Sequence, residues 1–160
     1  MKRIGIISDT HGNYNAMDAC VSKAKDVDAW FHLGDYAIDA DRLSKSTGKQ
    51  VYSVAGNCDI LSNAPSELTV ELEGLKLLLM HGHKYDVSVN DIYRACLRAQ
   101  ELNCNAIFYG HTHVSEISNY GGLITVNPGS PSSPRNGRCP SFAIAELEDG
   151  RIRVKIVAVN

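Results

Sequence analysis

Short apolar runs alternate with polar segments along the first third of the chain. The runs at residues 4–7, 29–33 and 51–54 have the length of buried strands, and each ends at a polar turn. Between the first two, Asn13 can cap a helix that runs to about Lys25, and a short helix is expected around residues 40–46. This alternation predicts parallel strands joined by crossover helices.

The pattern changes in the second half of the chain. Two strands joined by Glu73-Gly74 are predicted to form a hairpin, and they are followed by a helix and a buried strand at residues 90–101 and 106–109. Beyond residue 114 every predicted element is a strand, with tight turns at Gly121-Gly122 and Asp149-Gly150. The predicted strands of this half cover residues 68–72, 76–80, 106–109, 116–119, 123–126, 142–147 and 152–157. The mixture predicts an α/β protein in which two sheets pack together with helices outside. Residues 127–140, rich in Pro, Ser and Gly, are too long for a tight turn and are a candidate functional loop.

Composition narrows the picture by exclusion. A chain of 160 residues fits one domain covering residues 1–160, and its 44% hydrophobic and 21% charged residues are ordinary for a globular protein. The net charge of −2 and the scattered basic residues argue against a dedicated nucleic-acid surface.

Targeting and redox signals point to the cytoplasm. No apolar run approaches the length of about 18 residues that a membrane-spanning helix needs, and Ser8-Asp9 interrupts the first run too early for a signal peptide. The five cysteines form no CxxC pair, which favours free thiols in a reducing compartment. We therefore expect a cytoplasmic protein without a membrane partner, and we leave open whether it forms a homo-oligomer.

Side chains suited to metal binding follow five of the predicted strands. Ligands bind outside the carboxyl ends of parallel strands, so these side chains are expected to meet. The strand ends contain Asp9-Thr10-His11, Gly34-Asp35, Gly56-Asn57, His81-Gly82-His83 and Gly110-His111-Thr112-His113. In extended backbone, the two-residue spacing within the first and last of these segments would direct both ligand side chains of each to one side. The candidate ligands are Asp9, His11, Asp35, Asn57, His81, His111 and His113.

The chemistry of this set favours two ions. Oxygen and nitrogen ligands without cysteine suit Mn²⁺, Ni²⁺, Fe or Zn²⁺, and among these we favour Mn²⁺. Seven ligands are too many for one tetrahedral ion but fit two ions about 3.5–4 Å apart that share a carboxylate. Such a pair polarises a phosphoryl oxygen and lowers the pKa of a bridging water, which makes hydroxide available near neutral pH.

Each residue also has an ordinary structural interpretation. A histidine at a strand end more often makes a structural hydrogen bond, and Gly34-Asp35 and Gly56-Asn57 alone are common turn dipeptides. We assign His32, inside an apolar strand, to the core, and we divide His83 evenly between supporting a ligand and facing solvent. The functional hypothesis depends on the ordered set.

That ordered set resembles the calcineurin-like metallophosphoesterase superfamily, whose motifs read DxH, GD, GN, HG and GHxH. The similarity covers residues 4–135 and extends to its branch of small YfcE-like phosphodiesterases through residues 56–59 and 127–131. It implies a four-layer α/β-β/α sandwich of two mixed β-sheets flanked by helices. The resemblance places Asp9, His11 and His113 on a first metal and Asn57, His81 and His111 on a second, bridged by Asp35. It also implies Asp35, Asn57 and His81 as catalytic residues that act with a metal-bound hydroxide as the nucleophile.

One position departs from the family pattern. Many members have a histidine directly after the GN asparagine, proposed to assist the departing group, and this chain has Cys58 there. We therefore expect hydrolysis of small phosphodiesters whose leaving group needs little protonation, with a phosphomonoesterase as the near alternative. Arg135 is either a phosphate contact or a solvated surface side chain. A metal-binding protein-interaction scaffold of the same fold, like a subunit of the retromer coat, is the non-enzymatic alternative. It is disfavoured because every ligand position is filled here.

Overall fold

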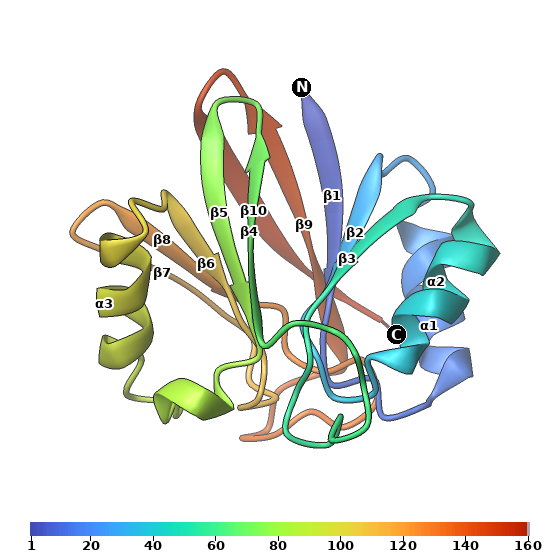
Figure 1. The fold of residues 1–160 in the computed structure, drawn as a ribbon. Coiled ribbons are helices and arrows are strands. Elements are labelled where there is room, and N and C mark those ends of the chain that lie inside the picture. Colours follow the sequence, from blue (N-terminus) through green and yellow to red (C-terminus); the bar gives the residue numbers. More distant parts are fainter. Residues whose placement is uncertain (160) are drawn as a thin grey trace.

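Two five-stranded sheets lie face to face in the computed structural model, which describes residues 1–159 (Figure 1). The strand orders are β10-β9-β1-β2-β3 and β4-β5-β6-β8-β7. The strands are β1 (Lys2–Ile7), β2 (Ala29–His32), β3 (Gln50–Ser53), β4 (Glu67–Leu72), β5 (Leu75–Met80), β6 (Ala106–Phe108), β7 (Glu116–Tyr120), β8 (Leu123–Asn127), β9 (Ser141–Glu148) and β10 (Arg151–Ala158). The helices are α1 (Tyr14–Lys23), α2 (Ile38–Thr47) and α3 (Tyr93–Glu101), with a 3₁₀ turn, η1, at His83–Tyr85.

Both sheets are mixed, as the resemblance implied. β1, β2 and β3 are parallel to one another, and so are β5, β6 and β8. β9 and β10 extend the first sheet in antiparallel pairing, whereas β4 and β7 form the antiparallel edges of the second. Helices α1 and α2 cover the outer face of the first sheet and α3 covers the outer face of the second (Figure 1). The predicted four-layer α/β-β/α sandwich is therefore confirmed.

Side chains that alternate between the two faces of each strand form three apolar layers, one between the sheets and one between each sheet and its helices. On β2, Phe31 points between the sheets and meets Phe108 of β6 edge-on, with ring centroids 5.4 Å apart. Its neighbour Trp30 points the other way and packs with Met17 and Cys20 of α1. This period of two is the reason that apolar residues occur consecutively in β2, since a strand covered on both faces buries every side chain.

The predicted elements are present, and the largest shifts are at helix ends. Asn13 caps α1 as expected, because its Oδ1 accepts the Ala16 N–H at 3.0 Å, but the helix ends at Lys23. The predicted helix start at residue 90 is wrong, because Ser88 and Asp91 bond each other's backbone in a turn. The Asp91 carboxylate then accepts the Tyr93 N–H at 2.9 Å, so α3 starts at Tyr93.

Three further predictions concern the β4–β5 turn, the cysteines and membrane-spanning helices. The predicted β4–β5 hairpin is confirmed, with left-handed φ angles of 51° at Glu73 and 74° at Gly74. All five cysteines are free. Within residues 1–159, no helix has the length and apolar character needed to cross a membrane.

The direction of the strands determines where the ligand candidates lie. The strands that precede them, β1, β2, β3, β5 and β6, run the same way within each sheet, and their carboxyl ends meet at the lower edge in Figure 1. The loop of residues 127–140 passes along this same edge, since the Ser130 hydroxyl donates to the Asp9 carbonyl at 2.8 Å.

Candidate metal centre

The loops that carry the ligand candidates are tightly bent. Asp9 and His11 have φ angles of 55° and 47°, and His111 and His113 have φ angles of 70° and 59°. Our expectation that extended backbone aligns each pair is therefore wrong. Left-handed backbone is costly for residues of this size, so neighbouring contacts must stabilise it.

A buried polar network provides those contacts for the loop after β1. The Asp39 carboxylate accepts the Thr10 hydroxyl at 2.6 Å and the Gly12 N–H at 2.9 Å. His32 lies 3.1 Å from the same hydroxyl, and its other ring nitrogen accepts the Gly34 N–H at 3.3 Å. The core position predicted for His32 is confirmed, because its side chain is fully buried. Sequence reasoning missed Asp39, since an aspartate near a helix start gives no sign that it is buried.

Two glycines let the ends of β2 and β3 approach each other. A Cβ on Gly34 would lie 2.6 Å from the Gly56 nitrogen and 2.9 Å from Nδ1 of His81. A Cβ on Gly56 would overlap both Oδ1 and the backbone nitrogen of Asp35. These glycines are therefore required by close packing around the Asp35 carboxylate.

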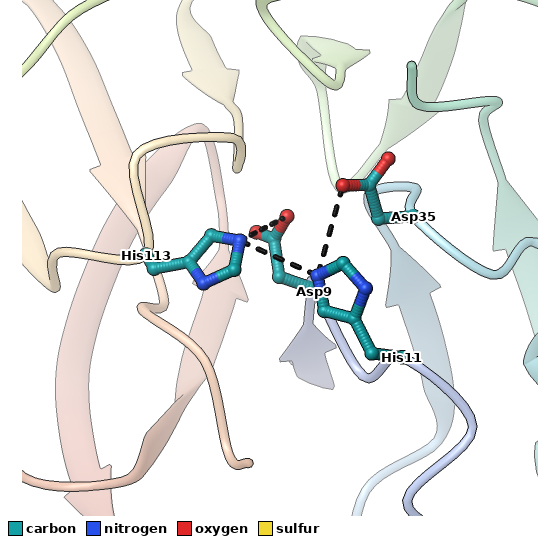
Figure 2. Close-up of side chains that lie close together, drawn as sticks. All are labelled: Asp9, His11, Asp35 and His113. Atoms are coloured by element: carbon teal, nitrogen blue, oxygen red, sulfur yellow. Dashed lines mark hydrogen bonds and ion pairs between the residues drawn. The ribbon is translucent and has the colours of Figure 1, made fainter. Parts of the chain in front are cut away.

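Four of the candidates form one cluster (Figure 2). One ligand atom from each of Asp9, His11, Asp35 and His113 lies within 4.8 Å of the other three. Nε2 of His113 lies 3.2 Å from Oδ1 of Asp9 and 3.4 Å from Nε2 of His11. Nε2 of His11 lies 3.7 Å from Oδ2 of Asp35.

The other three candidates lie on the opposite side of Asp35. Oδ1 of Asn57 lies 3.1 Å from Nε2 of His81 and 3.1 Å from Nδ1 of His111. Nε2 of His81 is also 3.4 Å from Oδ1 of Asp35. The two Asp35 oxygens therefore face different groups, Oδ2 toward His11 and Oδ1 toward His81. The structure thus brings all seven candidates together.

Backbone carbonyl oxygens determine which ring nitrogen of His81 and of His113 faces the site. Nδ1 of His81 donates to the Leu33 carbonyl and Nδ1 of His113 donates to the Ser133 carbonyl, each at 2.7 Å. In a neutral ring the Nε2 atom then carries a lone pair, which faces Asp9 in His113 and faces Asn57 and Asp35 in His81. Such support by a carbonyl orients ligating histidines in metal sites.

This donor set fits cations. Oδ1 of Asp9 is buried and has no hydrogen-bond donor, although Nε2 of His113 and Nε2 of His81 lie 3.2 and 3.7 Å away. With both rings neutral, these three atoms are all acceptors. A buried, unpaired carboxylate oxygen is costly, and a metal ion among the acceptors removes the conflict.

The charged groups of the cluster shift one another's pKa. Burial alone would raise the pKa of Asp35, but the adjacent His81 ring and the hydrogen bond from the Cys58 N–H hold that pKa well below its usual range. The pKa of His113 is raised, first by the Asp9 carboxylate beside its Nε2 atom. Burial and the nearby His81 lower the pKa of His111. The surroundings of Asp35 therefore keep this carboxylate ionised, as a metal ligand must be.

The remaining candidates lie around this cluster. Cys58 is exposed, and its N–H donates to Oδ1 of Asp35 at 3.0 Å. The ring of His83 is 5.4 Å from that of His81, and its buried Nδ1 has no hydrogen-bond partner. The side chain of Arg135 is exposed, whereas its N–H donates to the His113 carbonyl at 3.1 Å.

Comparison with known proteins identifies the family. Residues 1–150 match the model of the calcineurin-like phosphoesterase superfamily domain. The chain is 30% identical to the probable metallophosphoesterase YsnB of Bacillus subtilis over 94% of this chain and 87% of that protein. It is 32% identical to the phosphodiesterase YfcE of Escherichia coli over 76% of this chain and 63% of that protein.

A solved structure agrees with the sequence comparison. A predicted phosphoesterase from Streptococcus pneumoniae superimposes with a TM-score of 0.84 and 30% identity, covering 99% of this chain and 90% of that one. The predicted fold and family are thus confirmed, together with the general activity. The chain belongs to the calcineurin-like phosphoesterase superfamily of metal-dependent phosphoester hydrolases.

Proposed function

We propose that this protein hydrolyses small phosphodiesters with two divalent metal ions bound in one domain, and that Mn²⁺ is the favoured metal. In this assignment Asp9, His11 and His113 hold the first ion and Asn57, His81 and His111 hold the second. The position of Asp35 carries the proposal, because its Oδ2 lies 3.7 Å from His11 and its Oδ1 lies 3.4 Å from His81. A carboxylate shared between two donor sets is typical of dinuclear hydrolases.

Backbone groups of the chain hold the proposed ligands in place. Bound cations supply Lewis acidity, which neutralises charge on the phosphate and activates water. His81 and His113 are oriented by the Leu33 and Ser133 carbonyls, so their Nε2 atoms are fixed before a substrate arrives. Asp35 is fixed in turn by the Cys58 N–H at 3.0 Å. Preorganisation of this kind lets the site stabilise the charge of the transition state without rearranging.

The side chain of Cys58 favours diesters over monoesters. A thiol ordinarily has a pKa of about 8.5, against about 6.5 for the histidine that many family members carry at this position. It is therefore the weaker proton donor to a departing oxygen, so poor leaving groups gain little assistance. The relative YfcE, named a phosphodiesterase, supports the same choice.

Metal counting and turnover test the proposal together. The protein loaded with Mn²⁺ should contain close to two ions per chain by elemental analysis, and hydrolysis of bis-p-nitrophenyl phosphate should rise until the second ion is bound. p-Nitrophenyl phosphate, the monoester, should react more slowly. Full activity at one ion per chain would contradict the dinuclear site. Two bound ions without turnover of either ester would favour a protein-interaction scaffold.

The variant Asp35→Asn tests the bridging carboxylate directly. It removes charge between the two cations, so both ions should bind more weakly and kcat/KM should fall by about 100-fold or more. Asp18→Asn, on the exposed face of α1, should leave both metal content and turnover unchanged. If Asp35→Asn binds two ions with wild-type affinity and turns over normally, Asp35 is not the bridge.

A further inference from the structure

A groove of about 1460 Å³ leads away from the metal centre between α2 and the β3–β4 loop. His11 and Cys58 line it as well as the metal centre, so the groove and the centre are continuous. Its far end lies at Lys49 and Gln50, where β3 begins. In Figure 1 the β3–β4 loop extends below the sheets on the side where α2 lies. The space exceeds what a phosphate needs, so a bound ester has room for a large substituent.

Several of the side chains that line this groove, among polar ones, are apolar and open to solvent. Ile60 and Leu61 in the β3–β4 loop are 89% and 97% exposed, and Ile38 on α2 is 71% exposed. Single exposed apolar residues are ordinary, but several that line one hollow mark a binding surface. We call Tyr36, Ile38, Ile60 and Leu61 the apolar wall.

One carboxylate sets the distance between the two sides of the groove. Oδ1 of Asp59 accepts the Ala37 N–H at 2.7 Å, at the start of α2. Oδ2 of Asp59 accepts the Gly56 N–H at 2.8 Å, within the β3–β4 loop. At the base of this loop, the Ala55 N–H donates to the Pro65 carbonyl at 2.8 Å. The groove is therefore ordered by the protein itself, which lowers the entropy cost of binding there.

Tyr36 stands where the groove meets the metal centre. Its φ angle is 69°, which is unfavourable for an aromatic residue and is characteristic of functional sites. The ring meets that of His11 edge-on, with the centroids 5.5 Å apart, and it is 43% exposed. A retained ester group that extends from the phosphate toward the groove would contact this ring first.

We propose that the apolar wall binds an uncharged aromatic or alkyl substituent of the phosphodiester, an inference that rests on the proposed function. Charge supports this choice of ligand. Among the described residues that line the groove, the acids Asp41 and Asp59 accompany one lysine, Lys49. A second phosphate is usually bound by paired basic side chains, so a polyanion such as RNA fits this groove poorly.

Two esters with one leaving group measure the preference. Phenyl p-nitrophenyl phosphate and methyl p-nitrophenyl phosphate differ in the retained group alone, so the ratio of their kcat/KM values reports on the groove. We expect the wild type to favour the phenyl ester by about tenfold, equivalent to about 1.4 kcal/mol. Ile60→Ser/Leu61→Ser should reduce this preference to about twofold and change kcat/KM for the methyl ester by less than twofold.

A matched control replaces the same residue types elsewhere. Leu97 of α3 and Ile117 of β7 are 41% and 43% exposed outside the groove, so Leu97→Ser/Ile117→Ser should keep the phenyl preference. If Ile60→Ser/Leu61→Ser hydrolyses both esters with the wild-type ratio of kcat/KM, the apolar wall does not bind the substituent. The proposed function would then be unaffected. Sedimentation velocity adds a further test, since loss of an oligomer in this variant with unchanged selectivity would identify a self-association surface instead.

Binding separates the two proposals if turnover is absent. Phenylphosphonate should bind the Mn²⁺-loaded protein more tightly than methylphosphonate in calorimetric titration, and Ile60→Ser/Leu61→Ser should remove most of the difference. A fully loaded wild type that hydrolyses no ester would contradict the proposed function, and the phosphonate preference would then decide the groove independently. Equal affinity of the wild type for the two phosphonates would contradict binding of the substituent at the apolar wall.

Discussion

The two ends of the sheets use left-handed backbone for different reasons. At the end away from the metal centre, the residues with left-handed φ angles belong to tight hairpin turns such as Glu73-Gly74 and Asp149-Gly150. These turns meet, since the Gly150 N–H donates to the Glu73 carbonyl at 2.9 Å. At the metal centre, left-handed angles occur at Asp9, Asp35 and Tyr36, among others, outside such turns.

The difference shows which contacts stabilise each kind of backbone. A hairpin turn is specified by two neighbouring residues, because glycine adopts positive φ without steric cost. A left-handed histidine or aspartate needs support from distant segments. For the loop after β1, that support comes from Asp39 in α2 and from Ser130, 121 residues away from Asp9. Substitutions at the two ends should therefore differ in both size and kind.

The largest effect is expected from one pair of glycine variants. Gly56→Ala would drive a methyl group into Asp35, so the carboxylate must move and activity should fall by about 100-fold or more. Gly74→Ala meets nothing within 4 Å but keeps a φ of 74°, so it should cost about 1–2 kcal/mol of stability and leave kcat/KM unchanged. Denaturant unfolding and diester hydrolysis of both variants test the contrast. Equal activity in the two would show that close packing at Gly56 does not position Asp35.

An intermediate effect is expected from the network beneath the site. Asp39→Ala leaves the Thr10 hydroxyl and the Gly12 N–H without their acceptor, so Mn²⁺ affinity should fall by about 10–100-fold. Stability should also fall by about 1–3 kcal/mol. Asp18→Ala, which removes an exposed carboxylate 3.7 Å from Arg42, is the control and should change neither quantity measurably. If Asp39→Ala unfolds more easily yet binds Mn²⁺ normally, the network serves stability alone.

The smallest effect is an improvement at the opposite end of the sheets. Glu73→Asn places Asn-Gly in the β4–β5 turn, where asparagine tolerates the φ of 51° better than glutamate. The substitution also removes a partly exposed ion pair with the amino terminus of Met1, so the net gain should be about 0.5 kcal/mol, or about 1–2 °C in Tm. Glu71→Asn, in the extended part of β4, should lower Tm instead. Diester hydrolysis should be unchanged in both variants, and a loss of activity would show that the turn is coupled to the site.

Sequence patterns determined the elements, the hairpin turns and which side chains meet. Apolar runs of strand length, the cap at Asn13 and the Glu73-Gly74 dipeptide act over a few residues, so they can be interpreted without the fold. The convergence of Asp9, Asp35 and His81 follows from a general rule, since parallel strands bring their carboxyl ends to one edge.

Tertiary structure decided how those side chains are held. Contacts between distant segments produce the left-handed backbone at Asp9, the division of the Asp35 oxygens between two donor groups, and the burial of Asp39. The groove likewise depends on Asp59 reaching Ala37, 22 residues earlier in the chain. Sequence patterns report periodicity and local conformation, whereas these features depend on which segments pack side by side. That packing is fixed when the whole core forms.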